Sequence, residues 1–380
     1  MDAIYTIDFD HSSGVYAPGQ CVRGSLTIRN QNAINALSLK ICIHGEVQTH
    51  WKERLKERRL KSGHPVSHTH LKAGHYYNYA DHINYKTTSN ILEGVSQPWS
   101  SIENPTNKIP MGVNIFPFMF QLPFNCPPSF EGTHGSIRYS VHLELNRPWS
   151  MDVEARRMFS VIPIIDLNTI PKCINPMVSS ACKHSGFLGS KEVKVKVNLP
   201  KSGFAPGEII PIATAIHNHT KKPVYYLKAK LIQHVHYQAQ QVNTHFLPDE
   251  HCHKHCSHKT AETMISEVEK SFQVNCCSDG NIHVALVLPN PLVPSFRTQT
   301  IEVDYVVSVE VENDKKLRCD FPVTIGTIPV GQMMGMARAP AFSIVQPDVN
   351  VIESPPEYQE RVEIVMASAP PPEFAEDAHF

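Results

Sequence analysis

The sequence predicts an all-β chain of two tandem antiparallel, immunoglobulin-like β-sandwich domains, and two observations support this prediction. The first is an internal repeat: Ala17-Pro-Gly19 recurs as Ala205-Pro-Gly207, and Pro128-Ser-Phe130 recurs as Pro294-Ser-Phe296. The spacings, 188 residues (18 to 206) and 166 residues (130 to 296), are too long for a solenoid and suit two copies of one domain. The second is hydrophobic alternation with a period of two, which is typical of strands with one buried face.

The alternation is clearest in four segments, where apolar residues are separated by single, mostly polar residues. The apolar positions are Leu37, Leu39, Ile41 and Ile43; Ile137, Tyr139, Val141, Leu143 and Leu145; Val193, Val195, Val197 and Leu199; and Ile301, Val303, Tyr305, Val307, Val309 and Val311. Two sheets with such faces bury them against each other, which predicts sandwiches. The Ala-Pro-Gly motif marks a turn before a strand, because Pro presets φ and Gly tolerates positive φ.

The same patterns set the expected boundaries. We expect a first sandwich over 1–162, a hinge over 163–190 where alternation is poor, and a second sandwich over 191–327. The remaining residues, 328–380, are rich in Pro and lack a periodic apolar face. Such a segment cannot bury enough apolar surface to offset its ordering entropy, so we expect a disordered tail.

The two repeat spacings differ by 22 residues, which places an insertion in the first copy. The interval from Trp51 to Ile115 holds it and is rich in His, Tyr, Asn and basic residues. We expect a long surface loop or irregular edge there rather than core. Within it, Trp51 to Lys61 is the one helix-like stretch, either a solvated edge or short helix, or a basic patch facing phosphate or lipid.

The composition bounds the function. Net charge is −1 and the apolar content is 41%, which gives no global case for nucleic acid binding and suffices for real cores. The first residues lack the pattern of a signal peptide, and no apolar run reaches the length of a membrane span, so we expect a cytoplasmic protein with its ten cysteines as thiols. No phosphate-binding glycine loop and no G-x-S-x-G motif occurs, so we expect no enzyme.

The ordered motifs resemble the arrestin superfamily and, within it, the α-arrestin or arrestin-domain-containing branch, over roughly residues 1–327. The residues that carry this resemblance are Tyr16-Ala-Pro-Gly-Gln20, Phe116-Pro-Phe118, Leu122-Pro123, Pro128-Ser-Phe-Glu-Gly132, Gly135-Ser-Ile-Arg-Tyr139, Arg147-Pro-Trp149, Asp166-Leu-Asn168, Pro206-Gly-Glu208 and Asn218. The resemblance implies two arrestin-like sandwiches joined by a short hinge. It implies an adaptor rather than a catalyst.

The tail carries a PPxY motif formed by Pro355, Pro356 and Tyr358. Paired prolines favour the polyproline II helix, so little ordering entropy is lost when WW domains bind them. In α-arrestins, which the chain resembles, such motifs recruit WW-domain HECT-type ubiquitin ligases. Pro371 and Pro372 with Phe374 keep the prolines but lack the tyrosine hydroxyl, which predicts a weaker WW-binding site or none.

These features together predict an adaptor whose partners are a WW-domain HECT-type ligase and the cytoplasmic regions of transmembrane receptors or transporters. The expected outcome is ubiquitination, endocytosis and transport of that cargo, with the adaptor recruited to the plasma membrane and endosomes through it. One alternative is a ligase-independent structural subunit of an endosomal sorting coat, which would not need the PPxY motif.

A second alternative is a metal-binding protein. His251, Cys252, His255 and Cys256 are ligand types that zinc favours, and Cys252 and Cys256 have a C-x3-C separation. The spacing is not that of a paired C-x2-C frame, which favours a His-rich surface loop over a zinc site. We therefore expect no cofactor, with a structural zinc as the other interpretation.

Overall fold

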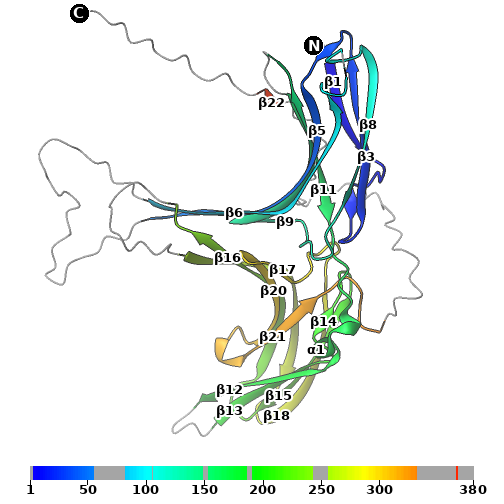
Figure 1. The fold of residues 1–380 in the computed structure, drawn as a ribbon. Coiled ribbons are helices and arrows are strands. Elements are labelled where there is room, and N and C mark those ends of the chain that lie inside the picture. Colours follow the sequence, from blue (N-terminus) through cyan, green and yellow to red (C-terminus); the bar gives the residue numbers. More distant parts are fainter. Residues whose placement is uncertain are drawn as a thin grey trace, which may run out of the picture.

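The computed structural model describes residues 3–54, 82–104, 106–148, 153–185, 191–242, 256–331 and 365–366, and almost all of them lie in strands or the turns between them. The predicted all-β fold of two tandem sandwiches is confirmed, and the second domain lies below the first in Figure 1. No helix within these ranges has the length and apolar character needed to cross a membrane.

The described part of the first domain contains eleven strands. They are β1 (Ala3–Phe9), β2 (Val15–Tyr16), β3 (Cys21–Asn30), β4 (Ile34–Asn35), β5 (Ser38–Arg54), β6 (His82–Ser100), β7 (Lys108–Ile109), β8 (Gly112–Gln121), β9 (Phe130–Gly132), β10 (Gly135–Asn146) and β11 (Val153–Val161). A β1-β3-β8 sheet packs against a larger sheet of order β2-β11-β10-β5-β6, in which β9 also pairs with β10.

The second domain repeats this plan. Its strands are β12 (Met177–Ser185), β13 (Lys191–Leu199), β14 (Gly203–Phe204), β15 (Ile209–Asn218), β16 (Val224–Gln240), β17 (Cys256–Val274), β18 (Ser278–Val287), β19 (Phe296–Arg297), β20 (Ile301–Val311) and β21 (Arg318–Ile325). A β12-β13-β15-β18 sheet packs against the order β14-β21-β20-β16-β17, in which β19 also pairs with β20. The helical segments are short: η1 (Leu167–Thr169), α1 (Pro171–Ile174) and η3 (Lys315–Leu317).

The predicted core positions are buried. On β10 all five alternating residues from Ile137 to Leu145 have no exposed surface, and on β20 the six from Ile301 to Val311 are at most 1% exposed. Leu37 is the exception: it precedes β5 and is 46% exposed. Period-two alternation thus identified the inner faces of the sheets, because successive side chains on a strand point to opposite sides.

The interval predicted to be a loop after Trp51 needs correction. Strand β5 continues through Arg54, and β6 returns antiparallel to it over 19 residues, so within this interval only residues 55–81 and residue 105 lie outside the described part. Trp51 is buried and stacks on Tyr85 of β6, with ring centroids 5.7 Å apart. The helix-like residues Trp51 to Arg54 are therefore strand, and the later ones of that stretch fall outside the described residues.

The segment predicted as a hinge, 163–190, also contains more structure than its pattern indicated. Strand β12 lies within it and pairs with β13 from Met177–Leu199 to Ser185–Lys191, so it is the edge strand of a second-domain sheet. Only one side of an edge strand is paired, and the residues of β12 are all partly or largely exposed, which removes the apolar signal. In the tail the structure describes residues 328–331 and β22 (Val365–Met366). Strand β22 pairs with β11.

The turns that begin each repeat have the same backbone. Gly19 and Gly207 take φ values of +81° and +82°, a region that favours glycine. Each glycine N–H donates to a proline carbonyl at 3.3 Å, from Gly19 to Pro123 and from Gly207 to Pro289. The Pro-Gly motif and the Leu-Pro motif are therefore hydrogen-bonded to each other within each domain.

In each sandwich a buried tyrosine anchors the connection that carries the Pro-Ser-Phe motif. The hydroxyl of Tyr139 donates to the carbonyl oxygen of Pro127 at 2.8 Å, and that of Tyr305 to the carbonyl oxygen of Val293 at 2.6 Å. Burial raises the pKa of both hydroxyls, so each remains a donor. These bonds tie the Pro-Ser-Phe connections to strands β10 and β20.

We expect Tyr139→Phe and Tyr305→Phe each to reduce the free energy of unfolding by about 1–3 kcal/mol, because a buried carbonyl loses its donor. Urea unfolding followed by fluorescence measures this. The matched control is Tyr225→Phe at a ring that is 48% exposed, which should change stability by no more than about 0.5 kcal/mol. Equal stabilities for all three variants would contradict the anchoring role.

Candidate binding surfaces

The two domains meet through residues that occupy equivalent places in the repeat. Phe130 and Phe296 are the third residues of the two Pro-Ser-Phe motifs, and their rings pack edge to face with centroids 5.5 Å apart. Thr49, which is fully buried, donates its hydroxyl to the carbonyl oxygen of Gln238 at 2.8 Å. His134 and Tyr237 pack edge to face beside them at 5.5 Å. The interface therefore has approximate two-fold symmetry.

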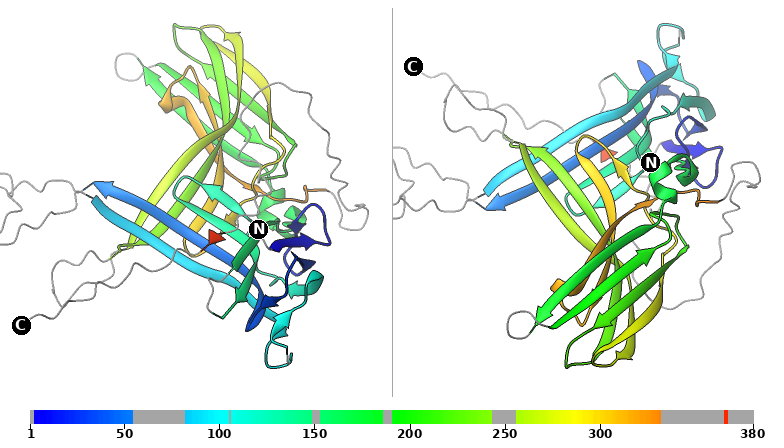
Figure 2. Two further views of the ribbon diagram at one scale, coloured as in Figure 1. Left: turned by 90° about the horizontal axis from the view of Figure 1, so that it is seen from above. Right: turned by 90° about the horizontal axis from the view of Figure 1, so that it is seen from below.

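Two long hairpins extend this interface. Figure 2 shows the β5–β6 hairpin lying across the β16–β17 hairpin. Tyr85 forms a bridge with Gln241, and the N–H of Gln240 donates to the hydroxyl of Thr87 at 3.0 Å. The Lys259 ammonium lies 6.0 Å from the Trp51 ring centroid. These contacts cover the apolar side of the first hairpin where it passes beyond its own sandwich.

The connection between the domains is bonded to the residues that follow the second domain. Ile165 and Thr327 exchange backbone and side-chain hydrogen bonds, at 2.7 Å from the Ile165 N–H to the Thr327 hydroxyl. The side-chain oxygen of Asn168 accepts a hydrogen bond from the Gly331 N–H at 2.8 Å. The chain therefore leaves the second domain at a fixed point beside the interdomain connection.

A cleft of about 420 Å³ lies at the junction of the domains. Its lining combines residues of both, among them Ile91 and Cys126 of the first domain and Phe296 of the second. Pro127, Pro128 and Pro163 add apolar rings. Such a lining suits an apolar side chain of a bound segment better than a charged substrate.

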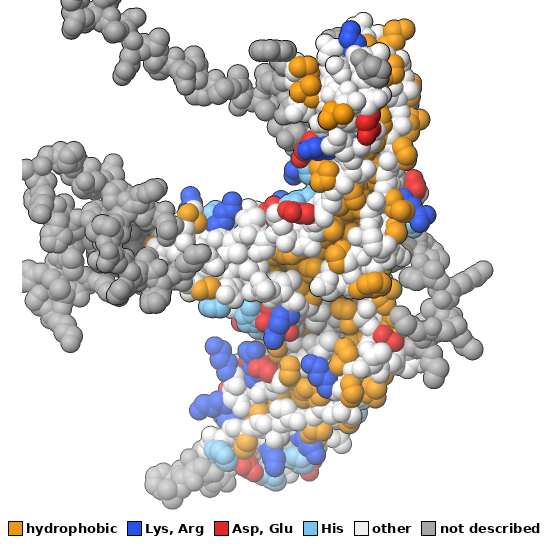
Figure 3. Space-filling view, viewed as in Figure 1, with side chains coloured by type: hydrophobic (Ala, Val, Ile, Leu, Met, Phe, Trp, Pro, Cys, Tyr) orange, Lys and Arg blue, Asp and Glu red, His pale blue; other side chains and the backbone are white. Residues whose placement is uncertain are grey.

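The larger sheet of the first domain bends so that its outer face is concave (Figure 1). Lys, Arg and His side chains gather along the hollowed side of the molecule in Figure 3. On β5, His44 lies 3.4 Å from the Glu46 carboxylate, and on β10, His142 Nε2 lies 3.3 Å from Glu144 Oε1. Burial lowers the pKa of His142, so its ring favours the neutral form.

The corresponding face of the second domain carries a pair of neighbouring carboxyl groups. Glu302 and Asp304 lie two residues apart on β20, and Arg297 donates to Glu302. Burial, followed by the hydrogen bond and charge of Glu302, raises the pKa of Asp304 above its usual value. His234 and His236 on β16 stand directly opposite these carboxyls in register. This face is therefore a mixed-charge surface whose protonation responds to pH.

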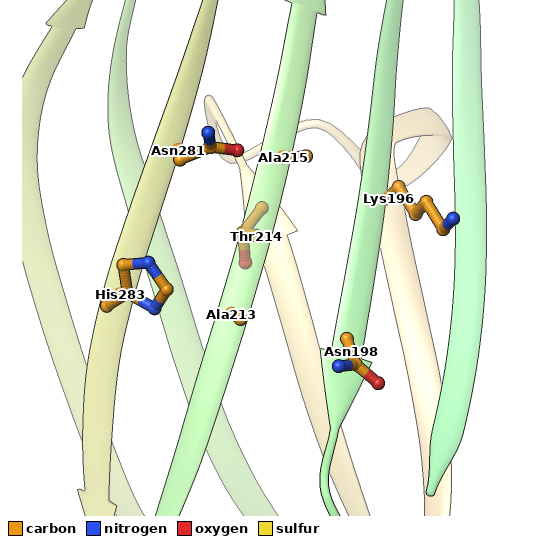
Figure 4. A pocket seen from close by; sticks show the side chains of 7 residues that line it. All are labelled: Lys196, Asn198, Ala213, Thr214, Ala215, Asn281 and His283. Atoms are coloured by element: carbon orange, nitrogen blue, oxygen red, sulfur yellow. The ribbon is translucent and has the colours of Figure 1, made fainter.

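A third surface lies on the outer face of the β13-β15-β18 sheet. Ala213 and Ala215 leave a hollow of about 410 Å³ between the longer side chains of the flanking strands (Figure 4). The side chains around it, Lys196, Asn198, Asn281 and His283, are spread along the strands and do not converge on one point. That arrangement is a shallow trough with hydrogen-bonding rims rather than a catalytic centre.

The residues predicted to bind partners fall mostly outside the described ranges. Pro355, Pro356 and Tyr358, and Pro371, Pro372 and Phe374, all lie there. So do His251, Cys252 and His255 of the predicted metal cluster, while Cys256 is the exposed first residue of β17, opposite Gln240. These assignments remain predictions.

Two groups of side chains of metal-ligand type, which sequence reasoning missed, are brought together by strand pairing. One is Cys42, His142 and Glu144; the other is Cys182, His184 and Glu192. In the first, burial and the Glu144 carboxylate raise the pKa of the Cys42 thiol to about 11. In the second, Cys182 Sγ lies 3.4 Å from Glu192 Oε2 and 3.7 Å from His184 Nε2.

Comparison with known proteins agrees with this architecture. Residues 5–168 match the sequence profile of the arrestin (or S-antigen) N-terminal domain, and residues 189–330 that of the arrestin C-terminal domain. The chain is 24% identical to Arrestin domain-containing protein 17 of Caenorhabditis elegans over 369 residues, 93% of this chain and 78% of that protein. It is 27% and 26% identical to Arrestin domain-containing protein 4 of Mus musculus and of Homo sapiens, in each case over 84% of this chain and 70% of the relative.

We expect Phe130→Ala and Phe296→Ala to be energetically coupled. A double-mutant cycle in urea unfolding should give a coupling energy of about 0.5–1.5 kcal/mol, the range measured for aromatic pairs in contact. The control pair is Phe9 with Phe296, because the ring contacts of Phe9 are with Tyr16, Phe118 and Phe159 of the first domain. The control pair should be additive. Additivity of Phe130 and Phe296 would rule out the interdomain ring contact.

We expect Asp304→Asn to become more stabilising as the pH rises. The folded-state pKa of Asp304 lies above 3.8, so its protonated form stabilises the fold below that pH and this contribution is lost as the pH rises through the raised pKa. Asparagine keeps a neutral side chain at every pH. Unfolding free energies of variant and wild type between pH 3 and pH 7 test this.

The control for this pH effect is the same substitution in a Glu302→Gln background. Since the Glu302 carboxylate contributes to the raised pKa, the pH-dependent gain from Asp304→Asn should shrink there. A gain independent of pH in both backgrounds would show that the two carboxyls do not interact.

Proposed function

Because the chain belongs to the arrestin-domain-containing family, we propose that it is a cytoplasmic adaptor that brings a WW-domain HECT-type ubiquitin ligase to membrane-protein cargo. The cargo is the cytoplasmic part of a transmembrane receptor or transporter. Binding leads to ubiquitination of the cargo and then to its endocytosis and transport. The adaptor reaches the plasma membrane and endosomes through its cargo, and the transfer of ubiquitin is carried out by the ligase.

The observation that carries this proposal is the PPxY motif in a chain with two arrestin domains. The two prolines present ring surface to the aromatic groove of a WW domain, and Tyr358 adds a ring and a hydroxyl on the same side. Pro371, Pro372 and Phe374 supply a second, weaker segment without the hydroxyl. Two segments on one chain raise the avidity for a ligase with several WW domains.

The geometry of the scaffold supports a tethering mechanism. The chain leaves the second domain at Gly331, which is bonded to Asn168 in the interdomain connection. Pro355 follows 24 residues later, so the motif lies at most roughly 80–85 Å from that point in any conformation. A ligase bound there stays within reach of lysines on cargo held by the same adaptor, which raises its effective concentration.

The concave faces of the two domains are the proposed cargo surfaces. They present histidines and charged side chains rather than a deep pocket, which suits a peptide segment of a receptor or transporter. Electrostatic complementarity on such faces contributes to the choice of partner and to the rate of association.

A second candidate function is that of a ligase-independent, sorting-coat-like subunit. The observation in its favour is that the described scaffold is held together by its own interdomain contacts, from the Phe130–Phe296 pair to the Thr49–Gln238 bond. Such a subunit would sort cargo without the PPxY motif. The two functions therefore differ in their dependence on Tyr358.

We expect Tyr358→Ala to lower the affinity for a purified WW-domain array at least tenfold and to lower cargo ubiquitination in cells to the same level as loss of the adaptor. Phe374→Ala should have a smaller effect, and Phe374→Tyr should raise affinity by restoring the hydroxyl. Affinity purification of wild type and variants, read out for ligase and cargo together, measures both partners. Cargo sorting that persists unchanged in Tyr358→Ala would favour the coat-like function and overturn the ligase proposal.

A further inference from the structure

Three potential metal ligands converge on the concave face of the first domain, where β5 pairs with β10. Cys42 stands directly opposite His142 in the register of the two strands, and Glu144 follows His142 by two residues. Residues two apart on a strand share a face, so all three side chains project to the same side. Both strands are central in their sheet, which fixes the spacing of the three residues.

The distances suit a small transition metal ion. One ligand atom from each residue, the Cys42 thiol sulfur, a ring nitrogen of His142 and a Glu144 carboxylate oxygen, all lie within 4.8 Å of one another. The Nε2 of His142 is 3.3 Å from Glu144 Oε1. In tetrahedral zinc sites, bonds of 2.0–2.3 Å separate neighbouring ligand atoms by about 3.3–3.8 Å, so only small side-chain movements are needed.

The ring of His142 gives a second, independent observation. Its Nδ1 is buried and makes no hydrogen bond with any residue in the described ranges. A buried polar atom without a partner costs about 1–3 kcal/mol, and a bound ion is one of the explanations for such an atom in a native protein. The other ring nitrogen, Nε2, lies 3.3 Å from Oε1 of the exposed Glu144 carboxylate, which can move to share a cation.

We propose that Cys42, His142 and Glu144 form a Zn²⁺ site with three protein ligands and one open position. The donor set of thiolate, imidazole and carboxylate is the one zinc accepts, and three protein ligands leave its fourth tetrahedral position for water. Binding releases the proton of the Cys42 thiol to solvent, because the thiolate is the ligand. The open position faces the concave surface, where a His, Cys or carboxylate side chain of a bound segment can replace the water.

This site is preferred over the two other candidate groups for physical reasons. Cys182, His184 and Glu192 form a comparable triad, but β12 is an edge strand and the Cys182 and His184 side chains are exposed, so little holds the ligands in place. The sequence cluster around Cys252 and Cys256 lies mostly outside the described residues. The half-buried triad on β5 and β10 is the one whose ligands are already positioned, which lowers the entropy cost of binding.

The test uses the full chain and Co²⁺, which replaces Zn²⁺ and reports cysteine ligation through a thiolate-to-cobalt charge-transfer band. The background variant carries Cys182→Ser, Cys252→Ser and Cys256→Ser, so that the competing cysteines are absent. We expect this background to bind one equivalent of Co²⁺ with a charge-transfer band, and Zn²⁺ to displace it. Addition of Cys42→Ser should abolish the band.

Two further variants separate coordination from folding. His142→Gln and Glu144→Gln in the same background should weaken Co²⁺ binding at least about tenfold, because losses of that size accompany even changes outside the ligand shell. Zn²⁺ should raise the Tm of the background variant and leave that of Cys42→Ser unchanged. Circular dichroism of the metal-free proteins tests whether each variant is folded. If Cys42→Ser is unfolded, the Co²⁺ affinities of the two glutamine variants test the proposal instead.

Two results overturn the proposal. One is the absence of a charge-transfer band in the background variant. The other is a band that survives Cys42→Ser and both glutamine variants. Both readouts concern the isolated adaptor, so they stand whether or not the proposed recruitment of a ligase is correct.

Discussion

The interface between the two domains is centred on the edge-to-face packing of Phe130 against Phe296, with the Thr49–Gln238 hydrogen bond and the His134–Tyr237 contact beside it. In each Pro-Ser-Phe motif the serine binds the end of its own sandwich: Ser129 and Ser295 donate to the carbonyl oxygens of Val161 and Ile325, both at 2.8 Å. The phenylalanine that follows is then free to face the other domain. Since the two motifs are copies, the chain meets itself through equivalent residues, as the subunits of an isologous dimer do. Aromatic pairs of this geometry add about 0.5–1.5 kcal/mol beyond the area they bury.

The sequence predicted the domain cores well because their signal is local. Alternation on β10 and β20 marks every buried apolar position there, and the glycines at 19 and 207 mark two equivalent turns with positive φ. It failed where burial comes from elsewhere in the chain. Trp51 lies beyond the sandwich of its own domain, and Tyr85 and the β16–β17 hairpin supply its packing. Strand β12 was missed for the opposite reason, since an edge strand has no fully buried face to produce a pattern.

The candidate metal ligands also show that sequence patterns miss contacts between distant parts of the chain. Sequence reasoning found the contiguous His and Cys residues from 251 to 256, because density along the chain is visible without a fold. Cys42 and His142 are 100 residues apart and become neighbours only through the register of β5 with β10. A shift of that register by one residue would turn one of the two side chains into the core. No pattern within either strand carries this information, so the site could be recognised only in the structure.

The duplicated scaffold also explains why its two concave faces differ in chemistry. By the repeat spacings, Glu46 and Arg138 of the first domain correspond to His234 and Asp304 of the second, and each pair is directly opposed in register. Arg138 bonds to Glu131 in the first domain, whereas the equivalent positions in the second hold Asp304 and Arg297, so the two charges are exchanged. An exchange of this kind leaves the ladder and core intact, because these side chains point away from both. It inverts the charge at these two positions of the face. The duplication thus preserves one fold while the two faces carry different charges at these equivalent positions.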